Sequence, residues 1–290
     1  MSRFRESLAP PATSFFRLEH PETPRGPVLV EVPHAGLAIP DEVRPELSPT
    51  ATDGRLRDAD IYVDKLYANA AREGAALLVA RASRYVVDLN RSADDVDLQT
   101  VPDHPSPRAV QPRGVVWRLA TDGRPLLRRP LPYAEFQRRL ERFHAPYHAA
   151  IRSELDRLRA GWGFAIALAA HSMPSMGRGL RSDRLVRRAD VVPGTRGGTT
   201  ADPRLIELVD QHFRQAGLSV RHDDPYRGGY TTAHYGRPSE GIHVVQIELN
   251  RALYVDERTG RPKSPELEAL RDVLDGLVRS VCELRLGPRG

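Results

Sequence analysis

FAIALAAHSMPSMGRG, residues 164–179, says most about how this chain folds. A continuous apolar run leads directly into His171, and Ser, Met, Pro and Gly then interrupt any regular element. A short apolar run that ends in turn-forming residues is typical of a buried strand. An imidazole at the end of such a strand is explained if other strands also bring polar side chains to the same edge of a sheet.

Three more apolar segments end in chemically capable side chains. VLVEVPHAG ends at His34, RYVVDLNR brings Asp88, Asn90 and Arg91, and VVQIELNR brings Glu248, Asn250 and Arg251. Taken singly, a histidine after a strand is more often a structural residue, and an arginine more often half of an ion pair. Ligands of α/β proteins bind beyond the carboxyl ends of the strands, so four such endings in one chain favour a functional site.

Strand-like and helix-like segments alternate along the sequence. Strands are predicted in PVLVEVP, AALLVA, RYVVDL, GVVWRL, FAIALAA, LSVRH and IHVVQIEL. Helices are predicted over residues 60–74 and 133–158, after Asp202 and Pro203, and at the C-terminus, with Pro146 kinking or splitting the longest one. This order predicts an α/β fold, a three-layer α/β/α sandwich around a mixed, mostly parallel sheet.

Residues 1–26 are rich in proline and have no hydrophobic periodicity, so we expect an extended N-terminal arm followed by a single domain over residues 27–290. No apolar run approaches the ~18 residues of a membrane span, and the first residues lack the apolar core of a signal peptide. We therefore expect a cytoplasmic protein that does not bind membranes. Either a monomer or a small homo-oligomer is compatible with the sequence.

The net charge of +5 raises the question of nucleic-acid binding, because arginines cluster in GRGLRSDRLVRRAD, residues 177–190. Acidic residues lie among these arginines, and almost no aromatic residues do. Nucleic-acid grooves usually interleave basic and aromatic side chains. The cluster therefore favours a solvated face or a small anionic ligand, and no nucleic-acid partner is predicted.

Two imidazoles and one carboxylate are the usual protein ligands of a hydrolytic zinc ion, which lowers the pKa of its water toward ~7. His34 and His171 would supply the nitrogens. The carboxylate should lie near the start of the first helix, where RDADIYVDKLY offers Asp58, Asp60 and Asp64. Asp60 is the prediction and Asp58 the alternative, although either could simply cap the helix. One divalent metal ion, with zinc as the first choice, is expected.

Glu248 leaves a largely apolar strand, and burial there should raise its pKa toward the range of a general base. It could take the proton of the metal-bound water. The alternative is a buried ion pair with Arg251.

Asn90 and Arg91 suit a clamp on a substrate carboxylate, because guanidinium and carboxylate match in planar geometry. The alternative is structural pairing of this arginine with an aspartate nearby: Asp88, Asp94 or Asp95.

The segment DDPYRGGYTTAHYGRP, residues 223–238, combines paired glycines with polar and aromatic side chains. Such a segment suits a flap that closes over a ligand, and it suits an ordinary long loop almost as well. As a flap it would bring Arg227 to a substrate carboxylate, and Tyr230 or His234 to the carbonyl that is attacked.

In their order, these motifs resemble the N-formylglutamate amidohydrolases, also called formylglutamate deformylases. The resemblance rests, between about residues 28 and 257, on VPHAG, DADIYVDKLY, SRYVVDLNR, PYH, HSMPS, PGTRGGTTADP, PYRGGYTTAHYG and HVVQIELNR. It implies a fold like that of zinc-dependent exopeptidases, a divalent metal, and hydrolysis of N-formyl-L-glutamate to formate and glutamate in histidine breakdown. The order of functional residues that it implies is filled here by His34, Asp60, Asn90 with Arg91, His171 and Glu248.

Two positions depart from that family's pattern. Relatives commonly carry an acidic residue two places before the second histidine, where this chain has Ala169, so a carboxylate that would orient His171 is missing there. They often carry an arginine just before His-Tyr-Gly, where this chain has Ala233. The second departure favours another N-acyl amino acid or a small peptide as an alternative substrate, with Arg227 as a substitute cation. A non-catalytic anion or nucleic-acid binder that uses the arginines of residues 178–188 is the third hypothesis.

Overall fold

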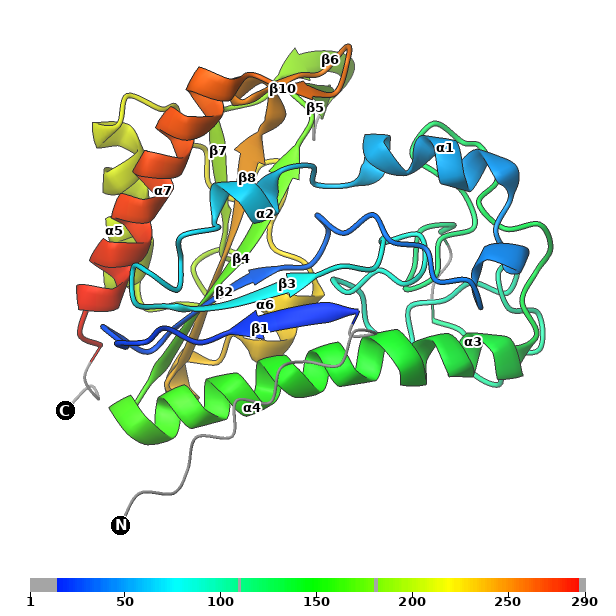
Figure 1. The fold of residues 1–290 in the computed structure, drawn as a ribbon, viewed down its shortest axis with the longest axis horizontal. Coiled ribbons are helices and arrows are strands. Elements are labelled where there is room, and N and C mark those ends of the chain that lie inside the picture. The colour runs from blue at the N-terminus through cyan, green and yellow to red at the C-terminus, as the bar shows by residue number, and fades with distance from the viewer. Residues whose placement is uncertain (1–14, 109–110, 180–181, 287–290) are drawn as a thin grey trace.

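The computed structural model describes residues 15–108, 111–179 and 182–286. Its centre is a six-stranded sheet in the order β1-β3-β2-β4-β8-β7 (Figure 1). The strands are β1 (Phe16–Glu19), β2 (Val28–Val32), β3 (Ala76–Ala80), β4 (Ala165–Met173), β7 (Val191–Gly194) and β8 (Ile242–Asn250). The four central strands run parallel and the two edge strands antiparallel, which confirms the mixed, mostly parallel sheet.

Helices cover both faces of this sheet. The helices are α1 (Pro49–Asp58), α2 (Val63–Leu66), α3 (Tyr133–Arg139), α4 (Ala145–Trp162), α5 (Pro203–Gln215), α6 (Tyr230–Tyr235) and α7 (Ser264–Glu283). Alternate residues of β2 point to opposite sides: Val30 joins the core under α5 and α7, and Leu29 joins the core under α4. Because both faces are buried, the central strands are apolar almost throughout, and the three-layer sandwich is confirmed (Figure 1).

The long predicted helix is divided, as expected from Pro146. One π-helical turn, Leu140–His144, lies between α3 and α4, and Pro146 is the second residue of α4. A proline cannot donate to a carbonyl in the preceding turn, so the backbone changes its winding there. The predicted start of α5 is also confirmed, because the Asp202 side chain accepts a hydrogen bond from the backbone N–H of Arg204.

Several predicted elements are wrong. Residues 84–89 form turns, residues 114–119 form only isolated bridges, LSVRH contributes one bridge at Val220, and the helix expected over residues 60–74 is helical only in α2. Tyr85, Val86 and Val115 are nevertheless buried in the core under α4. The β-branched and aromatic residues of these segments therefore indicate burial, and they do not show that the segments pair as strands.

Several elements of the structure are not among those predicted from the sequence. These are α1, α6, β7, the hairpin of β5 (Met176–Gly179) and β6 (Ser182–Arg187), the pair β9 (Val255–Asp256) and β10 (Arg261–Pro262), and the 3₁₀ turns Arg44–Glu46, Pro238–Glu240 and Arg251–Leu253. β1 lies inside the predicted N-terminal arm, where it pairs with β3 and extends the sheet. Within the described residues, none of the helices has the length and apolar character that crossing a membrane requires.

Candidate metal and substrate site

The carboxyl ends of β2, β4 and β8 meet at one edge of the sheet, as the sequence predicts. A cavity of about 1310 Å³ opens there, and its wall includes His34, Asp60, Asn90, Arg91, His171 and Glu248. Residues 88–91 reach this edge from a loop rather than from a strand. The predicted polar side chains are thus brought together, although one of the four segments that carry them is not a strand.

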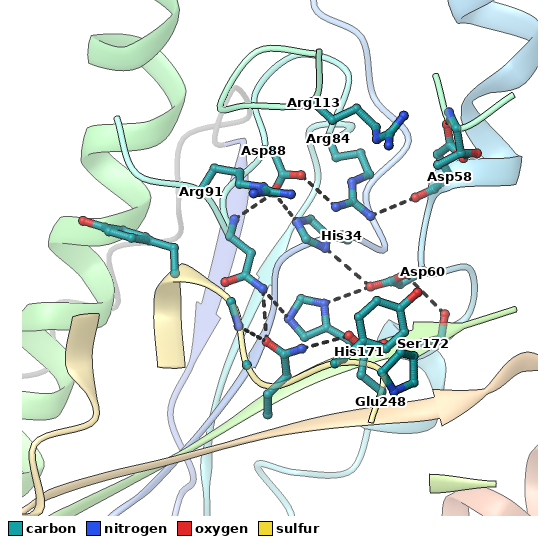
Figure 2. A pocket seen from close by; sticks show the side chains of 18 of the residues that line it. His34, Asp58, Asp60, Arg84, Asp88, Arg91, Arg113, His171, Ser172 and Glu248 are labelled. Atoms are coloured by element: carbon teal, nitrogen blue, oxygen red, sulfur yellow. Dashed lines mark hydrogen bonds and ion pairs between the residues drawn. The ribbon is translucent and has the colours of Figure 1, made fainter. Parts of the chain in front are cut away.

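His34, Asp60 and His171 form the group that could hold a metal ion. All three are buried, and one ligand atom from each lies within 4.8 Å of the others. Oδ2 of Asp60 lies 3.0 Å from Nδ1 of His171 and 3.5 Å from Nδ1 of His34, and Figure 2 shows the three side chains pointing toward one another. The loop after α1 is tied to the loop after β2, because the backbone N–H of Asp60 donates to the His34 carbonyl at 2.9 Å.

The protonation of His34 fits a metal ligand. Its Nε2 lies 2.8 Å from Oδ1 of Asp88, and a carboxylate can only accept, so Nε2 carries the proton. Nδ1 of His34 is then a bare lone pair, buried and without a hydrogen-bond partner, on the side of Asp60. A carboxylate that holds the far N–H of a histidine is a common arrangement around metal ligands. Asp88 is itself fixed by Arg84 at 2.7 Å and by the indole N–H of Trp117 at 3.0 Å.

The electrostatics keep Asp60 anionic. Burial alone would raise its pKa, but hydrogen bonds and charge from His171 and His34 outweigh burial and hold the pKa of Asp60 well below its usual range. Ser172 and Arg251 add hydrogen bonds to Oδ1 of the same carboxylate at 3.3 Å and 3.2 Å. Burial likewise would lower the pKa of His171, and the negative charges around it raise that pKa instead.

Asp58, the alternative carboxylate, is already occupied. It accepts a hydrogen bond from the Tyr85 hydroxyl at 2.7 Å, and both the hydroxyl and the backbone N–H of Thr121 donate to it. These bonds join the end of α1 to two loops. Asp58 therefore has a structural role, and Asp60 is the residue that faces the two histidines.

Glu248 is buried beside this group, and among the described residues no arginine forms an ion pair with it. It is the register partner of His171 on the neighbouring strand. Burial raises its pKa, and the side-chain amide of Gln246 donates a hydrogen bond to it at 2.9 Å. Arg251 bonds to Asp60 instead, so the alternative of a Glu248–Arg251 pair is not what the structure contains. A carboxyl group with a raised pKa in the cavity wall suits a general base.

Asn90 and Arg91 both line the cavity. The Asn90 amide lies 3.3 Å from Nε2 of His171 and accepts the backbone N–H of Thr231 at 2.9 Å, so it is fixed between the metal group and α6. Arg91 pairs with Asp95 at 3.2 Å, one of the alternatives named from the sequence, yet its side chain is 41% exposed and so remains open to a ligand.

The predicted flap divides into residues that face the cavity and one that does not. Arg227 and Tyr230 line the cavity. His234 does not: its ring stacks on Tyr230 at 4.8 Å between centroids, and its Nε2 lies 3.1 Å from Arg152 on α4. His234 therefore lies on α6 outside the cavity wall, with its side chain toward Arg152 of α4.

Arg113 and Arg188 also line the cavity. The sequence assigned neither to the substrate of a hydrolase, and Arg188 entered only as one of the clustered arginines of a non-catalytic binder. Both are half-buried, and within the described residues neither has a carboxylate at ion-pair distance. Nη1 of Arg188 donates to the hydroxyl of Tyr226 at 3.0 Å, and its guanidinium lies over the same ring. The arginine cluster of residues 177–190 was the available signal, but the sequence could not show which member turns inward.

The sequence was also compared with known protein families. The sequence profile of N-formylglutamate amidohydrolases matches residues 26–255. This chain belongs to the N-formylglutamate amidohydrolase family.

Relatives in this family match over most of their length. N-formylglutamate deformylase of Pseudomonas putida is 37% identical over 236 residues, which cover 80% of this chain and 83% of the relative. The protein of the same name from Pseudomonas aeruginosa is 36% identical over 261 residues, 89% of this chain and 93% of the relative. The crystal structure of N-formylglutamate amidohydrolase from Ralstonia eutropha JMP134 superposes with a TM-score of 0.82 at 33% identity, covering 92% of this chain and 97% of the other. The resemblance inferred from the motifs is confirmed, and the chain is an enzyme of the amidohydrolase class.

Proposed function

We propose that this protein hydrolyses the formyl amide of N-formyl-L-glutamate and releases formate and L-glutamate. The observation that carries the proposal is the convergence of His34, Asp60 and His171, with an unpartnered Nδ1 on His34 and Glu248 alongside, in an N-formylglutamate amidohydrolase family member. Two imidazoles and an anionic carboxylate match the donor set of zinc, so zinc is the metal we assign to them.

A zinc ion held by these three residues would polarise the formyl carbonyl and lower the pKa of a water toward ~7. Glu248 then accepts the proton of the attacking water. As the new C–O bond forms and the C–N bond breaks, the same carboxyl gives its proton to the departing amine. The raised pKa of Glu248 makes its carboxylate a stronger base toward the attacking water.

The cavity suits a dianionic substrate. We assign one substrate carboxylate to Asn90 and Arg91, and the other to cations elsewhere in the wall, with Arg227 and Arg188 as the candidates. Arg188 is the stronger of these two, because it is half-buried and its guanidinium is already fixed by Tyr226. We assign contact with the amide to Tyr230, the flap tyrosine that lines the cavity.

The test is formate release from N-formyl-L-glutamate by the purified protein, before and after chelation, together with its metal content. We expect about one zinc per chain and loss of formate release on chelation. The variant Glu248→Gln should keep its metal and lose at least 10²-fold in turnover, because general-base catalysis contributes about that much. The exposed Glu266→Gln on α7 is the matched control and should behave like the wild type. Near-normal turnover by Glu248→Gln would exclude Glu248 as the base.

A second substrate class is favoured by Ala233, which lines the cavity where a longer side chain could have contacted the substrate. Formyl, acetyl and succinyl derivatives of several amino acids, tested in parallel, distinguish the two proposals. A higher kcat/KM for an acyl group other than formyl, or for a side chain other than glutamate, would assign the protein to that substrate instead.

A further inference from the structure

Two histidines of the long helix that α3, the π-helical turn and α4 form together hold the loop that carries Asn90. Nε2 of His144 lies 2.9 Å from the carbonyl oxygen of Arg91, and Nε2 of His148 lies 3.0 Å from the carbonyl oxygen of Leu89. A carbonyl oxygen only accepts, so both Nε2 atoms carry protons and donate them. The two hydrogen bonds therefore fix the backbone immediately before and immediately after Asn90.

The helical spacing of these two histidines brings their rings together. His144 is the last residue of the π-helical turn and His148 lies four residues later in α4, so both project from one face, with their ring centroids 4.2 Å apart. Single π-helical turns are frequent at functional sites. Burial lowers the pKa of both imidazoles, that of His148 to about 3, so both are neutral and each has one N–H to donate.

The second nitrogen of His148 reaches the flap helix. Because Nε2 carries the proton, Nδ1 accepts, and the hydroxyl of Tyr235 lies 3.0 Å from it. The two rings also stack, with centroids 6.0 Å apart and an interplanar angle of 18°. Tyr235 is the last residue of α6, so His148 links the Asn90 loop to the flap helix through one imidazole.

The position of Asn90 depends on these links. Its backbone carbonyl accepts the N–H of Tyr230 at 3.3 Å, and its side-chain oxygen accepts the N–H of Thr231 at 2.9 Å. The opposite end of its amide lies 3.3 Å from Nε2 of His171. A Cβ atom on Gly229 would lie 2.3 Å from the Asn90 side-chain nitrogen, so the flap and the amide are in close contact. A small movement of the loop would therefore displace the Asn90 amide from His171 and from the flap together.

We propose that His144 and His148 are positioning residues for this reaction: they hold the backbone on both sides of Asn90 and so set its amide against His171, the flap and the substrate. His148 has the larger effect, because it also binds Tyr235 on α6. Its kinetic consequence rests on the proposed function, since Asn90 is there a substrate ligand.

The decisive variant is His148→Phe, which keeps an aromatic ring against Tyr235 and removes both nitrogens. We expect KM for N-formyl-L-glutamate to rise about tenfold, kcat to fall less, and metal content to stay at the wild-type value, because the metal-holding side chains are untouched. His148→Gln, whose amide N–H can still donate to the Leu89 carbonyl, should restore most of the loss. The matched control is His212→Phe, which removes the same kind of bond, from His212 to the Val273 carbonyl at 2.7 Å, on the opposite face of the sheet.

Hydrogen exchange separates this inference from the proposed function, because it needs no substrate. The backbone amides of residues 88–91 and 229–235 should exchange faster in His148→Phe than in the wild type, and at the wild-type rate in His212→Phe. If the wild type releases no formate but this pattern appears, the proposed substrate fails and the positioning role stands. Unchanged exchange in both segments, or an unchanged KM in an active His148→Phe, would overturn the role assigned to His148.

Discussion

Asp88 offers a sharp test of how the candidate metal site is supported. Its Oδ1 accepts Nε2–H of His34 and the backbone N–H of Asn90, and its Oδ2 accepts Arg84 and the indole N–H of Trp117. The variant Asp88→Asn has the same shape, but one end of its amide is an NH₂ group. Whichever way that amide turns, the NH₂ faces two donors that the carboxylate satisfied.

The magnitude follows from those two donors. A buried donor that loses its acceptor costs about 1–3 kcal/mol, so Asp88→Asn should lower the free energy of unfolding by about 2–6 kcal/mol. Loss of the acceptor that fixes a ligating histidine typically lowers metal affinity by about 10–100-fold. Both losses arise without any change in side-chain volume, so a packing defect does not contribute.

Two measurements on the same sample check this prediction. Urea unfolding in the presence of a chelator gives the stability, and competition against a chromophoric zinc chelator gives the metal affinity. Asp97→Asn is the matched control, because Asp97 is also buried and accepts the backbone N–H of Thr100 at 2.6 Å. It should lose stability and keep its metal affinity. If Asp88→Asn binds zinc as tightly as the wild type, the role assigned to Asp88 in orienting His34 is refuted.

Two further changes probe substrate recognition and acid stability. Arg188→Ala should raise KM for N-formyl-L-glutamate about tenfold, since it removes a half-buried cation from the cavity wall. Arg184→Ala, at an exposed position of β6, should leave KM unchanged, and equal KM values for the two variants would remove Arg188 from the site. Burial lowers the pKa of His148 to about 3 from the ~6.5 of the unfolded chain, so the unfolded state binds the extra proton first as the pH falls. Stability that is complete above about pH 6.5 should therefore decline by up to about 1.4 kcal/mol per pH unit toward pH 3, and urea unfolding of His148→Phe should show a shallower decline.

The elements that the sequence predicts correctly are those whose own residues are enough to identify them as a helix or a strand. β2, β4 and β8 are apolar on both faces, and α5 begins at a capping aspartate followed by proline, so their type can be recognised without their neighbours. Residues 84–89 were wrongly predicted as a strand because their own residues are also apolar. Their apolar character is real, but the chain there is buried as a loop, and whether an apolar segment finds a strand to pair with depends on the rest of the fold.

The residues of the site likewise fall into those that the sequence predicts and those that it does not. His34, Asp60, His171 and Glu248 could be predicted because each lies next to or within a recognisable element and has a side chain suited to one chemical task. The supporting residues could not, because their roles depend on contacts across long stretches of chain. Trp117 reaches Asp88 from 29 residues away, and His148 reaches Leu89 from 59. The sequence shows neither contact, although His148 belongs to the PYH motif.

Strand register explains why the alanine at position 169 does not leave the site without polar support. Ala169 faces the same side of the sheet as His171, two residues on, and its register partners are Glu31 on β2 and Gln246 on β8. Both partners are buried and polar, and Gln246 bonds to Asn90 and to Glu248. Asn90 in turn lies 3.3 Å from Nε2 of His171. Polar groups at the level of Ala169 thus come from the two neighbouring strands, and only the register of the sheet shows this.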